Sequence, residues 1–382
     1  MHFPENSSTK PNSTAADHSN DNTQKNFDRL SRIRYLGAAI ALAFGSGDTY
    51  YLPHEVSHRG GTTFIIQFII CYFLAALPML YLEIALGQFT SASPWYAYEL
   101  ICPGMAGIAG AFAFNIVLRI VVCAVWASHA FALFGVSLTG VFQTVPWDKC
   151  TDYTKCYNPR IADNCLFSSS NSTECAAFVR GLLHRRSDYI RDTSLVVYMR
   201  ELIKEDKELD AENVFPHPCI ILALIFVWFI ATIGEYQGID FLGITAYVVI
   251  FMKITYLIML AVIGLKKDTY KASFKILIDS TDYNFLNLEH WVIAAGHALY
   301  ALNVSTGGMI KLASTRPFRL PIVRDVLIIT FVTLIFHLIT LSTITGFISN
   351  YAGRIYTYDN IRHSFLLTSE RRLVIIAIVA EV

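Results

Sequence analysis

Residues 36–89 decide the fold, and they read LGAAIALAFGSGDTYYLPHEVSHRGGTTFIIQFIICYFLAALPMLYLEIALGQF. An apolar helix is expected to begin at Leu36, to break at residues 45–48 (Gly-Ser-Gly-Asp) and to end at Leu52-Pro53. Inside a bilayer, backbone that is not helical is tolerated only where it is buried in protein or lines a polar cavity. In secondary transporters, broken helices present carbonyl groups and helix ends to ions and substrates at mid-membrane. The stretch therefore predicts a discontinuous membrane helix with exposed backbone at its centre.

The composition indicates a protein that crosses the bilayer several times. The chain has 382 residues, of which 54% are hydrophobic and 16% charged, and its mean hydropathy is positive. Because a spanning helix needs about 20 apolar residues, the sequence predicts an all-α polytopic membrane helix bundle. A formal net charge of zero gives no indication of nucleic acid as a partner. The expected spans are residues 36–53, 64–86, 107–142, 217–234, 241–265, 291–313 and 326–348.

Basic residues beside the first span set the expected orientation. Lys25, Arg29, Arg32 and Arg34 precede this span, and the loop 314–325 carries three further arginines. The positive-inside bias then places the N-terminus in the cytoplasm of an integral membrane protein, expected in the plasma membrane. The expected organisation is a disordered cytoplasmic tail (1–35), spans one to three (36–142), a large extracellular loop (143–216), spans four to seven (217–348) and a C-terminal segment (349–382).

The loop 143–216 carries features of an oxidising compartment. It holds four of the eight cysteines and a glycosylation sequon at Asn171. An even cysteine cluster beside a sequon favours at least one disulfide, although four free thiols and an unused sequon fit the same residues. The pairing cannot be read from the sequence, and the candidates are Cys150 with Cys156 or Cys165. Residues 192–209 have the pattern of a solvated helix of mixed charge.

Motifs in a fixed order carry a resemblance to a known family. Residues 45–53 read Gly-Ser-Gly-Asp-Thr-Tyr-Tyr-Leu-Pro, residues 60–64 read Gly-Gly-Thr-Thr-Phe, and residues 83–88 read Glu-Ile-Ala-Leu-Gly-Gln. Trp126, a Pro-Trp-Asp-Lys-Cys at 146–150 and Arg324-Asp325 follow. Together they resemble the sodium-coupled neurotransmitter and amino-acid symporter family, whose members carry Gly-x-Gly-Asn-x-Trp-Arg-Phe-Pro, Gly-Gly-Gly-Ala-Phe and Leu-Glu-x-x-Leu-Gly-Gln at the first three places.

The resemblance covers residues 36–349 and implies a fold of two inverted repeats with discontinuous first and sixth helices. The sixth span would be Trp291–Ser314, broken near Asn303–Gly308. The chain would then hold the first inverted repeat and part of the second, and it is expected to work as part of a longer carrier. Such a carrier couples inward sodium movement to uptake of a small amino-acid or amine (neurotransmitter-like) substrate.

The resemblance also implies which residues bind sodium. Hard cations prefer oxygen ligands, and an unwound helix supplies carbonyl oxygens. By alignment, the Ala43 carbonyl would face a first sodium ion, and the carbonyl groups of Ala41 and Phe44 would face a second. Thr333 would offer a hydroxyl where the family has an asparagine. Asp48 also replaces an asparagine, and it is either a sodium ligand or a carboxylate facing an outer vestibule. No other cofactor is implied.

A second group of residues would surround the substrate. Gly45 resembles the amino-acid carriers of the family, in which a glycine leaves room for the substrate carboxylate. Three positions depart from the family. Ile120 stands where the family has a tyrosine whose hydroxyl holds this carboxylate, and Tyr51 stands where it has a gating arginine. Ala301 stands where the family has a serine or threonine that binds sodium. Chloride is implied only through His297 and His337, which stand at chloride-site positions. The residues implied to line the substrate pocket are Gly45, Gly47, Ile120, Tyr300, Leu302, Asn303, Ser305 and Thr306.

Three more charged residues lie inside expected spans. Glu83 is interpreted as part of a packing or polar network near the inner end of the second span. Arg119 and Lys253 are expected to snorkel or to pair with an acid, with Asp48 or Glu83 as candidate partners of Lys253.

Two other functions fit parts of the sequence. The missing tyrosine, arginine and hydroxyl positions also suit a non-transporting regulatory or scaffold protein derived from the same family. A seven-helix receptor would carry sugar on Asn6 or Asn12, whereas the carrier topology expects sugar on Asn171 alone. An enzyme is not indicated, because neither a nucleophile–base pair nor a metal-ligand spacing is found in the spans or loops. The oligomeric state is left open.

Overall fold

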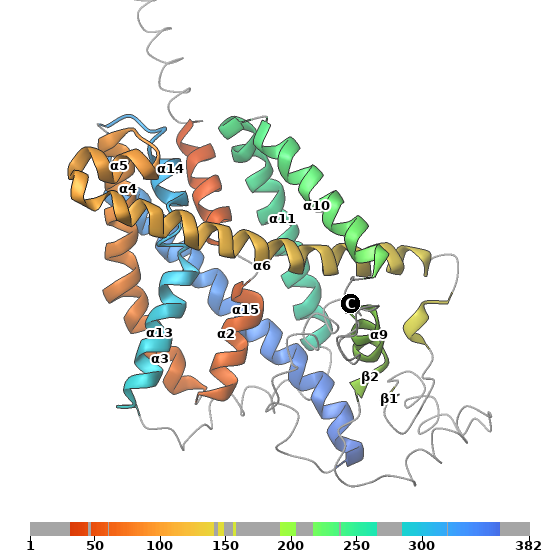
Figure 1. Cartoon of the computed structure of the whole chain (residues 1–382). Coiled ribbons are helices and arrows are strands. Elements are labelled where there is room, and N and C mark those ends of the chain that lie inside the picture. Colours follow the sequence, from red (N-terminus) through yellow and green to blue (C-terminus); the bar gives the residue numbers. More distant parts are fainter. Residues whose placement is uncertain are drawn as a thin grey trace, which may run out of the picture.

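The computed structural model is a bundle of helices (Figure 1). It describes residues 31–44, 47–59, 61–140, 144–148, 156–157, 192–203, 217–236, 238–265, 285–318 and 320–359. The predictions for the tail 1–30, for Cys150, Cys165 and Asn171, and for residues 360–382 lie outside the described residues, and of Cys156 only the backbone is described. The all-α fold class is confirmed, since the described strands, β1 (Cys156–Tyr157) and β2 (Asp192–Thr193), are two residues long.

The first span is interrupted where the sequence predicts. One helix covers residues 31–43, Phe44 is no longer helical, and α2 (Gly47–His58) follows. The predicted end at Leu52-Pro53 was wrong, because α2 continues through Pro53 to His58. Its last turn is held by an ion pair, with Arg59 Nε 2.6 Å from Glu55 Oε2, and the Arg59 amide also donates to the Glu55 carbonyl.

The second span runs without interruption but contains a wide turn. It comprises α3 (Thr62–Cys71), the π-helical turn η1 (Tyr72–Ala76) and α4 (Leu77–Thr90). Pro78 lacks an N–H and its ring crowds the carbonyl four residues earlier. The preceding turn therefore widens, and the Leu77 amide donates to the Tyr72 carbonyl, five residues back. α5 (Pro94–Ile101) and η2 (Pro103–Met105) lead to the third span.

The third span, α6 (Ala106–Thr139), runs crosswise to the other long helices (Figure 1). The fourth and fifth spans are α10 (Pro218–Tyr236) and α11 (Gly238–Leu265). The hydroxyl of Tyr247 in α11 donates to the Ile33 carbonyl at 2.6 Å, which fixes α11 beside the first helix.

The helix expected at residues 192–209 begins at Ser194, and residues 204–209 lie outside the described residues. It is α9 (Ser194–Ile203), which lies near η3 (Pro146–Asp148). Leu195, Met199 and Leu202 are buried, and they share a cluster with Ala132 and Leu133 of α6. The mixed charge suggested solvent exposure, but one apolar stripe of this helix is covered by the third span.

The sixth span is interrupted as predicted, and the seventh is longer than predicted. The sixth consists of α13 (Leu288–Ala301) and α14 (Gly308–Ala313), and the seventh is α15 (Ile322–Asp359). Within the described residues, four stretches are long and apolar enough to cross a membrane, and one apolar helix is shorter. The stretches are Thr62–Thr90, Pro103–Leu138, Phe241–Val262 and Ile322–Gly346, with Pro218–Gly234 as the shorter helix.

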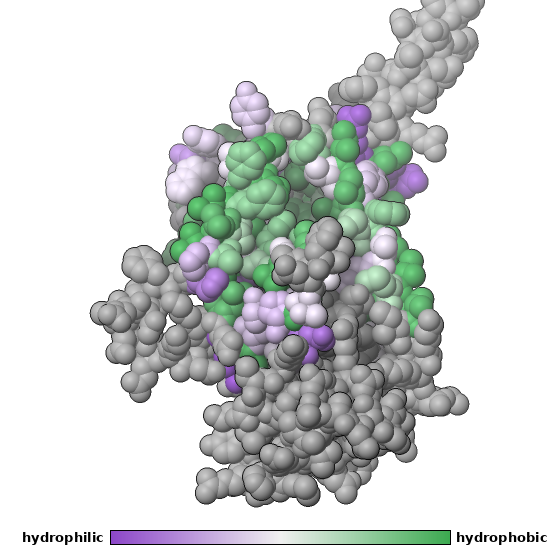
Figure 2. Space-filling view, turned by 90° about the vertical axis from the view of Figure 1, so that its right-hand side faces the viewer, coloured by the Kyte–Doolittle hydropathy of each residue, from purple (hydrophilic) through white to green (hydrophobic). Residues whose placement is uncertain are grey.

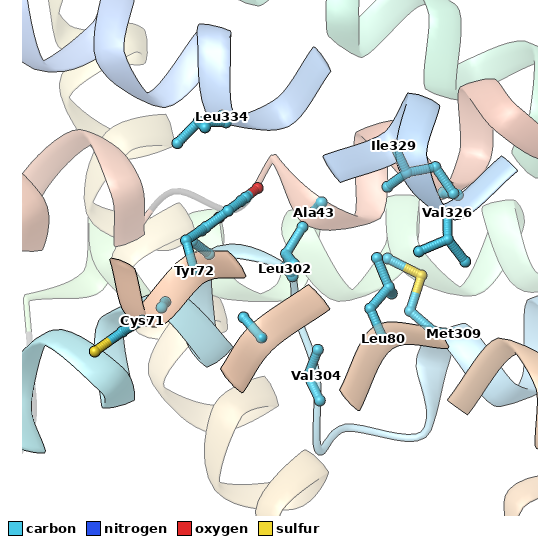
Figure 3. Packing of buried hydrophobic residues seen from close by; sticks show 14 of the residues in the cluster. Ala43, Cys71, Tyr72, Leu80, Leu302, Val304, Met309, Val326, Ile329 and Leu334 are labelled. Atoms are coloured by element: carbon cyan, nitrogen blue, oxygen red, sulfur yellow. The ribbon is translucent and has the colours of Figure 1, made fainter. Parts of the chain in front are cut away.

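The main core lies between the two interrupted spans and the helices beside them. Residues such as Ala43, Tyr72 and Leu302 are almost fully buried in one apolar cluster, and Figure 3 shows them close together. Apolar residues also dominate much of the described surface in Figure 2, as expected for a protein whose solvent is lipid.

An ion cluster closes one end of the bundle. Arg32 Nε donates to Asp325 Oδ1 at 2.9 Å, and Arg316 Nη2 donates to Asp325 Oδ2 at 3.1 Å. The Arg316 guanidinium also lies over the ring of Tyr35, 4.6 Å from its centroid. These contacts connect the first helix, the segment after α14 and the start of α15.

Candidate functional site

The interruption of the sixth span has backbone that an ordinary helix does not adopt. Asn303, Ser305 and Gly307 have φ angles of 54°, 68° and 71°. A positive φ at a residue with a side chain is strained, and it persists only when the surroundings hold it. The Asn303 and Val304 amides donate three and five residues back, to Tyr300 and Leu299, and the Ser305 peptide group needs partners from outside the sixth span.

Side chains from the second and third spans supply these partners. The Ser305 amide donates to Glu83 Oε1 at 2.7 Å, and Asn115 Nδ2 donates to the Ser305 carbonyl at 2.9 Å. Thr306 Oγ1 donates to the Asn303 carbonyl at 2.9 Å. Glu83 therefore belongs to a polar network, in agreement with its interpretation from sequence.

Arg119 of α6 reaches the same interruption from the side. Its Nη1 donates to Asn303 Oδ1, and its guanidinium carbon lies 4.2 Å from the centroid of the Tyr300 ring. The next residue, Ile120, is 43% exposed. The face of α6 that meets the sixth span is therefore the face of Asn115 and Arg119, which are one helical turn apart.

A cavity of about 400 Å³ opens beside this contact. Its polar lining residues include Arg119 and His297, and the ring of Tyr51 meets that of Tyr300 edge-on at 6.3 Å. An aromatic pair thus stands where the family resemblance implies a gating arginine. The complete lining is Tyr51, Leu118, Arg119, Val122, Ile293, Gly296, His297 and Tyr300.

The interruption of the first span lies against α11 and α15. Phe44 is buried, and its ring centroid is 4.6 Å from that of Phe336 and 6.3 Å from that of His337. The Lys253 ammonium lies 4.9 Å from the centroid of the Phe44 ring. A positive charge of α11 is therefore placed next to the point where the first helix ends.

His337 connects the two interruptions. Its Nε2 donates to the carbonyl of Ala301, the last residue of α13, at 3.2 Å, while its ring meets Phe44. One turn earlier in α15, Thr333 Oγ1 lies 2.7 Å from the Tyr72 hydroxyl. The ends of the two half-helices thus meet on one face of α15.

The match to a family model decides the family. The model of the sodium:neurotransmitter symporter family matches residues 27–361. The chain belongs to this family. Three relatives named sodium-dependent nutrient amino acid transporter 1 are similar to it: 26% identical over 339 residues in Drosophila melanogaster, 28% over 341 in Drosophila willistoni and 27% over 335 in Drosophila persimilis. These alignments cover 86% of this chain and 52%, 52% and 50% of the relatives. The chain spans about half the length of the relatives it matches.

The structure brings together some of the sodium residues expected in this symporter family. Ala43, Phe44 and Thr333 are all buried at the meeting point on α15, and Ala41 is partly buried one turn before Phe44. Of Asp48 only the backbone is described, as part of α2. Among the described residues, no group of three or more His, Cys, Asp or Glu side chains could hold a metal ion.

The residues expected around the substrate are divided between different places. Tyr300 lines the cavity, whereas the side chain of Leu302 is fully buried in the core and Ile120 faces outward. Asn303, Ser305 and Thr306 form the interruption itself, and they make polar contacts with other groups of the protein. Gly45 lies outside the described residues, and of Gly47 only the backbone is described.

The two histidines expected at a chloride site lie in different surroundings. His297 lines the cavity and meets Phe64 edge-on, with ring centroids 6.3 Å apart. His337 is 1% exposed, and its Nε2 is bonded to Ala301.

Sequence reasoning missed the contacts of Asn115 and Arg119 with the sixth span. The available signal was their spacing of four residues, which puts two polar side chains on one face of an apolar helix. Of the two candidate partners of Lys253, Glu83 accepts from the Ser305 amide, and the side chain of Asp48 lies outside the described residues.

Proposed function

We propose that this chain forms part of a sodium-coupled symporter for a small amino-acid-like or amine substrate in the plasma membrane. The observation that carries the proposal is the contact of His337 with both interrupted helices, at Phe44 and at Ala301. Helix ends and free carbonyl groups that meet inside a bundle are the means by which secondary transporters bind ions and substrates. The names of the relatives favour an amino acid over an amine.

In this proposal, one sodium ion binds to the Ala43 carbonyl, with oxygen atoms of Asp48 and Thr333. The carbonyl groups of Ala41 and Phe44 are expected at a second sodium ion, and the Lys253 ammonium near Phe44 opposes a cation there, because like charges repel strongly where water is scarce. We therefore expect one sodium ion per transport cycle. If chloride takes part, His297 is the better candidate, since it lines the cavity and His337 already donates to Ala301.

The proposed orientation has a cytoplasmic N-terminus. The cluster of Arg32, Arg316 and Asp325 would then face the cytoplasm, in keeping with the positive-inside bias. The pair of Arg59 and Glu289, with Nη1 2.9 Å from Oε1, would lie at the outer ends of α2 and α13. The loop disulfide from Cys150 and the sugar at Asn171 belong to the same proposal.

A non-transporting member of the family is the second candidate. It is favoured by Arg119, whose guanidinium contacts Asn303 and Tyr300 beside the cavity that a carrier would use for its substrate. Uptake measurements separate the two candidates, because a scaffold protein would move no substrate.

Sodium-dependent uptake tests the proposal directly. Cells that express the full-length protein containing this chain should accumulate one or more labelled amino acids in sodium medium and lose this uptake in choline medium. The sodium activation curve should be hyperbolic, as for a single ion. Uptake that is absent, or equal in both media, would contradict the proposal.

Thr333→Val should raise the sodium concentration that gives half-maximal uptake about fivefold, because a lost polar interaction of about 1 kcal/mol changes an equilibrium constant by that factor. Thr330→Val is the matched control: Thr330 is equally buried on α15, and its hydroxyl has no hydrogen-bond partner among the described residues. An equal effect of both substitutions would show that the Thr333 hydroxyl does not bind sodium.

A further inference from the structure

Arg119 is a cation inside an expected membrane span, and the acidic side chains that the structure describes leave it unpaired. It lies within the apolar stretch Pro103–Leu138, and no Asp or Glu side chain that the structure describes forms an ion pair with it. A charged side chain at such depth is unfavourable unless it is paired or serves a ligand. Among the described side chains, its positive charge is therefore not compensated by an acid.

Neutral groups hold this guanidinium in one position. Asn303 Oδ1 accepts one of its N–H groups, and the Tyr300 ring covers one of its faces. A guanidinium has five N–H donors in a planar fork, which matches the two oxygens of a carboxylate. The donors that Asn303 does not use remain available at the wall of the cavity that Arg119 lines.

The cavity has the size and walls of a site for an organic molecule rather than for a bare ion. Its volume of about 400 Å³ lies in the usual range of small-molecule pockets. Leu118, Val122 and Ile293 make part of its wall apolar, and Tyr51 and Tyr300 add aromatic rings. A ligand that fits has a carboxylate at one end and an apolar body of modest size.

We propose that Arg119 binds the carboxylate of a small organic ligand in this cavity. The inference rests on the proposed function and narrows it, because a fixed guanidinium attracts amino acids and other carboxylates but repels an amine that has no carboxylate. Ile120 has no hydroxyl to hold a substrate carboxylate. Arg119, the preceding residue of the same helix, would bind this carboxylate instead. Ile120 itself points away from the site.

Binding measurements on the purified full-length protein test this inference. The common L-amino acids are first screened by thermal shift in sodium buffer. The best binder is then compared with its decarboxylated amine and with its deaminated acid. We expect the amino acid and the deaminated acid to bind and the amine not to bind. Equal binding of the amine, or binding of no carboxylate by the wild-type protein, would overturn the inference.

The variant Arg119→Gln should weaken binding of the amino acid about tenfold to hundredfold, as expected for the loss of a hydrogen-bonded ion pair. Arg119→Lys keeps the charge but not the planar fork. Its affinity for the amino acid should lie between those of the wild-type protein and Arg119→Gln. The apparent melting temperature without ligand shows whether each variant is folded. Unchanged affinity in a folded Arg119→Gln would refute the role of Arg119.

The same titrations in choline buffer separate this inference from the proposed function. Binding that needs Arg119 but not sodium would support the carboxylate site and contradict sodium coupling. Binding that needs sodium but not Arg119 would support sodium coupling and contradict the carboxylate site at Arg119.

Discussion

Asp325→Asn is expected to lower the free energy of unfolding by about 3 kcal/mol. Asp325 and Arg316 are each only 4–5% exposed in their side chains, and Asp325 is the shared partner of Arg32 and Arg316. Removing one partner of a buried ion pair leaves an uncompensated charge, and losses of about 3 to 5 kcal/mol are typical. Denaturant or detergent unfolding of the purified protein measures the change.

Arg324→Gln is the control for this prediction, because Arg324 is the exposed neighbour of Asp325 in α15. It should change the free energy of unfolding by less than about 0.5 kcal/mol. Replacing Asp325 and Arg316 together by Leu and Met should restore part of the stability, since the buried charge is then removed as well. If Asp325→Asn behaved like Arg324→Gln, the ion cluster would not hold this end of the bundle.

Gly87→Ala is expected to destabilise the contact between the second span and α14 by about 3 kcal/mol. A Cβ at Gly87 would lie 2.2 Å from the carbonyl oxygen of Ile310 and 3.0 Å from the Cβ of Ala313. Backbone atoms cannot rotate away as a side chain can, so α4 and α14 would have to separate. Overpacking of this kind costs about 1 to 3 kcal/mol and occasionally more. The apparent melting temperature in detergent would fall accordingly.

Gly110→Ala on α6 makes the same chemical change without the close contact. A Cβ there meets nothing within 4 Å. Since alanine favours a helix over glycine by about 1 kcal/mol, this variant should be as stable as the wild-type protein or more stable. A similar melting temperature for both variants would show that α4 and α14 are not in close contact.

The interruptions could be predicted from sequence because their residues break helices by local chemistry. An unbroken apolar helix is destabilised by glycines such as those at 45 and 47, and by a polar run such as Asn303–Gly308. The same residues suit a broken helix, whose non-helical backbone is buried in protein or lines a polar cavity. Both interruptions are found, with α2 beginning at Gly47 and α14 at Gly308. The end of α2 was misjudged, because Pro53 is tolerated within a helix whose last turn is fixed by Arg59 and Glu55.

The rotation of α6 about its axis could not be predicted. The helix is apolar on nearly all sides, with Val117, Val121 and Val125 as exposed as Ile120, so hydrophobic periodicity does not define an inner face. Alignment placed Ile120 in the pocket, but the polar contacts of Asn115 and Arg119 place their face against the sixth span. Likewise, the partners of Glu83 and His337 are backbone groups of the interruption, and sequence gives no sign of which backbone group a side chain will meet.

Hydrogen–deuterium exchange with and without sodium tests the central claim, that the two interrupted helices form one sodium-responsive site. In the purified full-length protein, replacing choline by sodium should slow amide exchange in peptides that cover residues 41–47 and 300–308 together. Peptides from α10, which packs mainly against α6 and α11, should exchange at the same rate in both buffers. Protection of only one interruption, or no effect of sodium on either, would contradict the account.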